Sequence, residues 1–175
     1  MPHLLQPLLL ASVLWALLPL SRAIACDGDA TPVFSCEAGG GKKYIELCAV
    51  LPVTAESGYL EYRFGSQENS GFSQPPDLVF PTSRKDSLRH FFGATYSNAG
   101  TYTQSIRFET GQASYTVFTE ARGSVTTRAG VTVRPKHGTK VITVACNERP
   151  RFYIHEFKGL LACDSATPVG KACIE

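Results

Sequence analysis

The chain has 175 residues, and its 17 Lys and Arg residues nearly balance its 15 Asp and Glu residues, which leaves a formal net charge of +2. About 150 residues remain once an N-terminal leader is set aside, a length that favours one domain with a sizeable core. Basic residues gather in residues 122–151, but no aromatic side chain is interleaved with them. Single-stranded nucleic-acid binders stack bases on such aromatics, so we expect no nucleic-acid partner.

The first residues have the pattern of a secretory signal peptide. An apolar run over residues 4–20 precedes the small residues of segment 23–25 and then Cys26, which is the A-x-A type of cleavage site. One Gln and two Pro residues interrupt the run, and it barely reaches the ~20 apolar residues that a spanning helix needs. We expect cleavage after Ala25, with Ala23 as the alternative, and no transmembrane segment after cleavage.

Cys26 opens the predicted mature chain and permits a second interpretation. Bacterial lipoproteins carry a small-residue segment that ends in a lipidated Cys, and segment 23–26 resembles it loosely. All six Cys residues can pair in an oxidising compartment, whereas a lipidated Cys26 leaves an odd thiol. We therefore predict that residues 1–25 are a signal peptide and that residues 26–175 form one secreted or periplasmic domain, with a lipid anchor on Cys26 as the alternative.

Short stretches with a period of two follow the leader almost throughout. Residues 102–108, for example, place Tyr102, Gln104, Ile106 and Phe108 on one face and polar or charged residues on the other, which is typical of a half-buried strand. No segment has a convincing helical period, so we predict an all-β fold, an antiparallel meander that forms a small barrel or sandwich stapled by disulfides. Turn signals separate the predicted strands, which cover residues 43–50, 58–64, 102–108, 113–121, 123–134 and 139–146.

Two segments do not fit this strand pattern. Residues 66–77 are polar and rich in Gly and Pro, which predicts an exposed loop. Residues 146–175 follow the last predicted strand and contain the last Cys residues of the chain. We expect this C-terminal segment to be an extension that disulfides hold against the domain.

All six Cys residues are disulfide candidates, and six residues allow fifteen pairings. Cys36 with Cys48 ranks slightly ahead of the other pairs because the two are close in the chain. A simple hairpin turn at residues 39–41 would instead place Cys36 roughly opposite Tyr44. The four-residue offset to Cys48 is then ~13 Å along a strand, against the ~6 Å between Cα atoms that a disulfide allows. The candidates are Cys26, Cys36, Cys48, Cys146, Cys163 and Cys173.

Neither a metal nor a cofactor is expected. Asp27 and Asp29 begin like a calcium loop, but Pro32 stands where the loop needs Gly, and Ala38 stands where it needs Glu. Zinc sites use spacings such as C-x-x-C, which this sequence lacks. An exported chain also tends to oxidise its thiols.

No arrangement of residues marks a catalytic site. The chain has no G-x-S-x-G nucleophile elbow, and each His beyond the leader has a simpler role as a hydrogen-bonding residue. Glu46, Glu61 and Glu109 are expected on the polar faces of strands, where acidic residues are common. We therefore predict a protein that is not an enzyme, and keep a secreted hydrolase with an unmarked active site as the alternative. The His residues concerned are His90, His137 and His155.

Several segments follow one another in a recognisable order. A Cys strand "FSCEAGGGKKYIELC" comes first, then "LEYRFG", "DLVFP" and "YTVF", and finally "AGVTVRPKHGTKVITVAC". This order, from Cys36 to Cys146, resembles a group of small, uncharacterised exported bacterial β-proteins. The resemblance implies export and a β fold. It implies no activity or active site, because that group has none established.

The expected function is a non-catalytic binding or inhibitory module of the bacterial envelope. The chain has a faint parallel to the C-type lysozyme inhibitors, which are β-barrels that bind lysozyme through a Ser-Gly loop and a Lys loop. This parallel implies a lysozyme-like protein partner. The Trp-Trp-Thr-Lys-Gly segment of those inhibitors is absent here. An anionic envelope polymer is the other expected partner, since basic residues flank one turn. The alternative is that the same bases only keep the hairpin edges from pairing with other chains. No oligomeric state is predicted. The candidate anionic contact is Arg134, Lys136, His137 and Lys140, and the candidate partner loop is Ser57 and Gly58.

Overall fold

The computed structural model describes residues 26–69 and 71–175. The predicted signal peptide lies outside the described residues. The described part contains twelve strands, two short 3-10 helices and no α-helix, and none of its helices is long and apolar enough to cross a membrane. The strands are β1 (Thr31–Ala38), β2 (Lys43–Ala49), β3 (Leu60–Glu68), β4 (Gly71–Phe72), β5 (Leu78–Phe80), β6 (Phe91–Asn98), β7 (Thr101–Glu109), β8 (Ala113–Arg122), β9 (Val125–Pro135), β10 (Ile142–Ala145), β11 (Ala162–Thr167) and β12 (Gly170–Ala172).

The first sheet contains β1 to β5. Its strands follow the order β1-β2-β3-β4, and β5 pairs with β3. The turn between β1 and β2 uses Gly39, Gly40 and Gly41, all with positive φ, a conformation that glycine adopts without steric cost. This hairpin places Cys36 opposite Ile45, one residue from the expected position.

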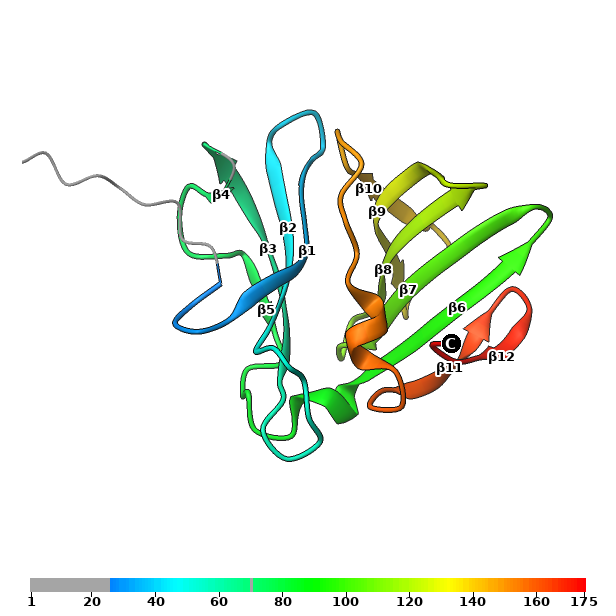
Figure 1. Ribbon diagram of the computed structural model, residues 1–175. Coiled ribbons are helices and arrows are strands. Elements are labelled where there is room, and N and C mark those ends of the chain that lie inside the picture. Colours follow the sequence, from blue (N-terminus) through cyan, green and yellow to red (C-terminus); the bar gives the residue numbers. More distant parts are fainter. Residues whose placement is uncertain (1–25, 70) are drawn as a thin grey trace, which may run out of the picture.

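The second sheet curls like half of a barrel (Figure 1). It has seven strands in the order β10-β9-β8-β7-β6-β11-β12, so β6 to β10 form the predicted antiparallel meander. β11 departs from that pattern because it pairs with β6 in parallel. Parallel pairing needs a long crossover connection, which the chain between β10 and β11 supplies through the 3-10 helix η2 (Ile154–Phe157).

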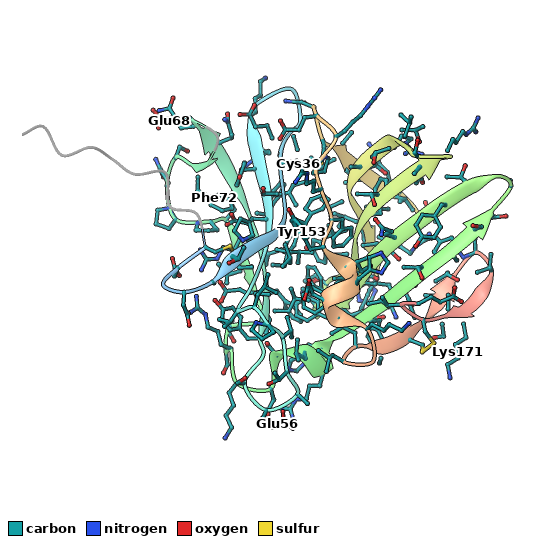
Figure 2. The ribbon with its side chains drawn as sticks, in the orientation of Figure 1. Cys36, Glu56, Glu68, Phe72, Tyr153 and Lys171 are labelled. Atoms are coloured by element: carbon teal, nitrogen blue, oxygen red, sulfur yellow. A yellow bond between two sulfur atoms is a disulfide. The ribbon has the colours of Figure 1, made fainter. Side chains whose placement is uncertain are left out.

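The two sheets face each other across one core (Figure 2). The ring centroids of Tyr62 on β3 and Phe108 on β7 are 4.9 Å apart, and Phe108 stacks on Phe80 at 4.6 Å. The crossover segment adds Ile154 and Phe157, both fully buried. The all-β meander is therefore confirmed, and it has the layered form of a sandwich in which one sheet is curled.

Three disulfides staple this fold, as predicted, and no free Cys remains among the described residues. The pairing of Cys36 with Cys48 is wrong, because Cys36 shares a face with Ile45, while Cys48 projects from the opposite face of β2. A lipid on Cys26 is also contradicted, since its sulfur is already bonded to another sulfur. The bonds are Cys26–Cys48, Cys36–Cys146 and Cys163–Cys173.

Two further expectations are corrected by burial. Within the predicted exposed loop 66–77, Gly71 and Phe72 form β4, and Phe72 is buried because its ring packs on that of Tyr44. Glu46 and Glu61 are buried as well, since the N-terminal segment covers their face of the first sheet. Only Glu109 lies on an exposed polar face as expected.

Candidate functional site

Two adjoining hollows lie where the chain crosses from β5 of the first sheet to β6 of the second. This crossing segment is at the bottom of Figure 1. They have volumes of about 630 Å³ and 450 Å³, and both are bounded by Lys85, Asp86 and Arg89. We call them together the basal cleft. The larger hollow is lined by Ala55, Glu56, Ser57, Gly58, Tyr59, Arg84, Lys85, Asp86, Leu88, Arg89 and Leu160, and the smaller by Phe80, Pro81, Thr82, Ser83, Lys85, Asp86, Arg89 and His90.

A short 3-10 helix, η1 (Ser87–His90), fixes one wall of the basal cleft. Ser87 is fully buried, and its Oγ accepts a hydrogen bond of 2.9 Å from the backbone N–H of Leu60 at the start of β3. The buried side chain of Leu88 adds an apolar anchor. Lys85, which precedes this helix, and Arg89, which lies within it, are thus attached to a backbone segment that the core holds in place.

The Ser57–Gly58 loop forms the opposite wall, beside the Glu56 labelled in Figure 2. Thr54 organises it: its Oγ1 lies 2.7 Å from Ser57 Oγ, and its carbonyl accepts a 2.9 Å hydrogen bond from Gly58 N. A Cβ on Gly58 would lie 2.4 Å from that carbonyl oxygen, so this tight turn needs glycine. The predicted partner loop therefore lines the larger hollow of the basal cleft.

Lys85 and Arg89 carry the free positive charge of the basal cleft. Both side chains are exposed, and neither forms an ion pair or a side-chain hydrogen bond within residues 26–69 and 71–175. Arg84 differs, because it lies 3.2 Å from Asp27 and 3.4 Å from Glu61. Sequence reasoning missed this site, although residues 84–90 hold several bases and a single acid.

Tyr59 adds an unsatisfied polar group to the same hollow. The residue is 7% exposed, and its hydroxyl has no hydrogen-bond partner in the described part of the chain. The guanidinium of Arg84 lies over its ring at 4.5 Å. A buried hydroxyl without a partner is costly, so an acceptor oxygen that reached it by displacing part of the wall of the larger hollow would be stabilised.

The predicted basic turn lies elsewhere. Arg134, Lys136, His137 and Lys140 are all exposed, and none of them lines the basal cleft. Arg134 borders a separate hollow of about 330 Å³ on the outer face of the second sheet, while Lys136 Nζ lies 3.7 Å from a Glu109 oxygen. The Ser-Gly loop and the basic turn therefore do not form one cleft.

A buried charged cluster covers the outer face of the first sheet. Burial raises the pKa of Glu46 to about 7, and a hydrogen bond from Arg63 lowers the pKa of Asp27. The atoms of Cys26, Glu46 and Cys48 that could bind a metal ion lie within 4.8 Å of one another. The two sulfurs are bonded to each other, so they offer no thiolate to a metal ion.

Three residues of the types that take part in acyl transfer border the smaller hollow of the basal cleft. Ser83, Asp86 and His90 border the same hollow, but no hydrogen bond joins any two of these side chains among the described residues. The ring of His90 instead lies 6.0 Å from that of Phe80.

Comparison with known protein families, with curated proteins and with solved structures found no match. The functional argument therefore rests on the geometry of the basal cleft.

Proposed function

We propose that this protein is an exported, non-catalytic binding module that holds an anionic envelope polymer in the basal cleft. Export agrees with the leader pattern and with three disulfides, because disulfides persist in oxidising compartments. A secreted or periplasmic location is proposed on the same argument, and the resemblance to small exported bacterial β-proteins agrees with it.

One observation carries the binding proposal: Lys85 and Arg89 border both hollows and have no acidic partner in the described part of the chain. Asp86 borders both hollows as well and Glu56 borders the larger one, so an anionic group would be recognised by direct contact with the two cations and not by a uniformly positive field. Arg additionally matches phosphate and carboxylate geometry with two parallel hydrogen bonds. The unpartnered Tyr59 hydroxyl provides a further donor.

The shape of the site favours a polymer over a lysozyme-like protein. The Ser57–Gly58 loop, next to the Glu56 at the lower tip of Figure 2, lines one side of the larger hollow together with Arg84, Lys85 and Arg89. Hollows of about 630 Å³ and 450 Å³ are in the size range of small-ligand sites. Together they suit consecutive charged units of a chain that carries phosphate or carboxylate groups.

Binding to peptidoglycan, lipopolysaccharide and lysozyme, each measured at two salt concentrations, tests this proposal. We expect salt-sensitive binding to one of the two polymers, because released counterions drive such contacts. Tyr59→Phe should weaken that binding several-fold without lowering thermal stability, since the hydroxyl has no partner to lose. Tyr102→Phe, at an exposed position outside the cleft, is the matched control. Salt-sensitive binding to lysozyme alone, or to none of the three, would overturn the proposal.

A further inference from the structure

Glu46 is a fully buried carboxyl group without a cation of its own. It lies in the middle of β2 with 0% exposure, and its Oε1 has no hydrogen-bond partner among the described residues. Burying an ionised carboxylate is unfavourable unless it is paired and hydrogen-bonded. The polymer binding proposed for the basal cleft does not involve this carboxyl group.

The neighbouring charges are already engaged with one another. Arg63 is the cross-strand neighbour of Glu46 on β3, but its Nη2 lies 2.6 Å from Glu61 and 2.5 Å from Asp27. The groups that face Glu46 are therefore one shared cation, Arg63, and two acids, Asp27 and Glu61. Arg84 also contacts these two acids, at 3.2 Å from Asp27 and 3.4 Å from Glu61. With Glu46 ionised, the cluster therefore holds three acids against two cations.

Cys26 is the other neighbour, and it is held in place covalently. Its disulfide to Cys48 anchors it two residues along β2 from Glu46, on the same face of the strand. Cys48 Sγ lies 3.4 Å from Glu46 Oε2, and a disulfide sulfur has no hydrogen to donate. The backbone N–H of Cys26 is hydrogen-bonded to the Glu46 carboxyl, so the nitrogen of residue 26 is in direct contact with the buried acid.

This nitrogen follows directly after the predicted A-x-A cleavage site. We propose that Glu46 is the binding site for the α-ammonium group of Cys26, which forms when a peptidase hydrolyses the bond between Ala25 and Cys26. Hydrolysis consumes one water: Ala25 leaves with a carboxylate, and Cys26 keeps the nitrogen as an ammonium group. This inference rests on the export part of the proposed function and is independent of the basal cleft.

The chemical gain is an exchange of one donor for three. A peptide N–H supplies a single hydrogen bond, whereas an ammonium group supplies three donors and a positive charge. The additional donors would reach the unpartnered Oε1 of Glu46. Together with Arg63 and Arg84, the ammonium charge would balance the three acids Asp27, Glu46 and Glu61. While the peptide bond is intact, burial raises the pKa of Glu46 to about 7. Pairing with the ammonium lowers that pKa and raises the pKa of the amine above its usual range of about 7.7–8.0.

The test compares two purified chains, one that begins at Cys26 and one that begins at Ala25. We expect an amine-reactive reagent at pH 7 to label the α-amine of the first chain at least tenfold more slowly than that of the second. Glu46→Gln should restore fast labelling in the first chain, and the matched control Glu68→Gln, at an exposed position of β3, should leave it slow. Carbon-13 NMR titration of Glu46 in the two unmutated chains should give the lower carboxyl pKa when the chain begins at Cys26, and this readout does not require the Gln variant to fold.

Equal labelling rates, or equal carboxyl titrations in the two chains, would overturn the inference. An exported protein whose intact mass shows a first residue other than Cys26 would overturn it as well. None of these readouts involves Lys85 or Arg89. Failure here therefore leaves polymer binding untouched, and loss of polymer binding leaves the contact between Cys26 and Glu46 untouched.

Discussion

Cys36 on β1 is bonded to Cys146, which directly follows β10, so one covalent link joins the two sheets. The same edge carries an isolated bridge between Ala38 and Cys146 and a 3.2 Å hydrogen bond from Gly39 N to the carbonyl of Ala145. The Cys36 half of the disulfide lies within the core, since Cys36 is 1% exposed. It therefore closes the sandwich at the edge where β1 and β10 meet.

Replacing both Cys36 and Cys146 with Ala should lower the free energy of unfolding by about 5 kcal/mol, because the bond closes a loop with a sequence separation of 110. The same replacement at Cys163 and Cys173, with a separation of 10, should cost about 3 kcal/mol. Urea unfolding of the two double variants gives the comparison. An equal or larger loss for the Cys163–Cys173 pair would contradict the loop-closure argument.

The buried carboxyl of Glu46 should make stability depend on pH in a chain that retains residues before Cys26. The pKa of Glu46 is about 7 in the folded state against an ordinary value of 4.5, so between these pH values the folded state holds a proton that the unfolded state has lost. The contribution of Glu46 to stability is therefore fully present below about pH 4.5. It is lost as the pH rises to 7, which lowers the free energy of unfolding by on the order of 3 kcal/mol. Asp27, whose pKa is lowered, acts in the opposite direction but only below this window.

Glu46→Gln should remove most of that fall, because an amide does not ionise. Urea unfolding at pH 4.5 and pH 7.5 measures it, with Glu68→Gln as the control that keeps the parent's pH dependence. A Glu46→Gln variant that loses as much stability as the parent between the two pH values would refute this explanation.

Gly58→Ala should displace the Ser57–Gly58 loop, since the new Cβ would lie 2.4 Å from the carbonyl oxygen of Thr54. We expect a stability loss of about 1–3 kcal/mol and weaker polymer binding. Gly111→Ala is the matched control, because no atom lies within 4 Å of a Cβ built there. Thermal unfolding and binding assays on both variants decide, and unchanged binding by a folded Gly58→Ala variant would show that this wall is not part of the site.

The strand pattern could be predicted because alternation is a local property. The predicted strands at residues 43–50 and 102–108 correspond to β2 and β7 within one or two residues. Contacts between residues that are far apart in the sequence leave no comparable pattern in either segment. The parallel contact of β11 with β6 and the bond between Cys36 and Cys146 both depend on how the chain returns after β10.

Burial of charged residues was missed for the same reason. Alternation correctly places Glu46 and Glu61 on the face opposite the core, but the N-terminal segment covers that face because Cys26 is bonded to Cys48. The basal cleft likewise exists only where the crossover from β5 to β6 meets the Ser57–Gly58 loop. The excess of basic residues in segment 122–151 led to the prediction of a site at Arg134 and Lys136. The cations that share a cleft are instead Lys85 and Arg89.

The most direct test of the binding proposal is the salt dependence of polymer binding in three charge variants. Lys85→Gln with Arg89→Gln should weaken binding about tenfold or more and reduce the slope of log affinity against log salt by about two. Lys42→Gln with Arg122→Gln, which removes the same charge from exposed positions outside the cleft, should bind like the parent. Parent-like binding by the Lys85 and Arg89 variant, with loss of binding on neutralising Arg134, Lys136 and Lys140, would place the site on the basic turn and contradict the account.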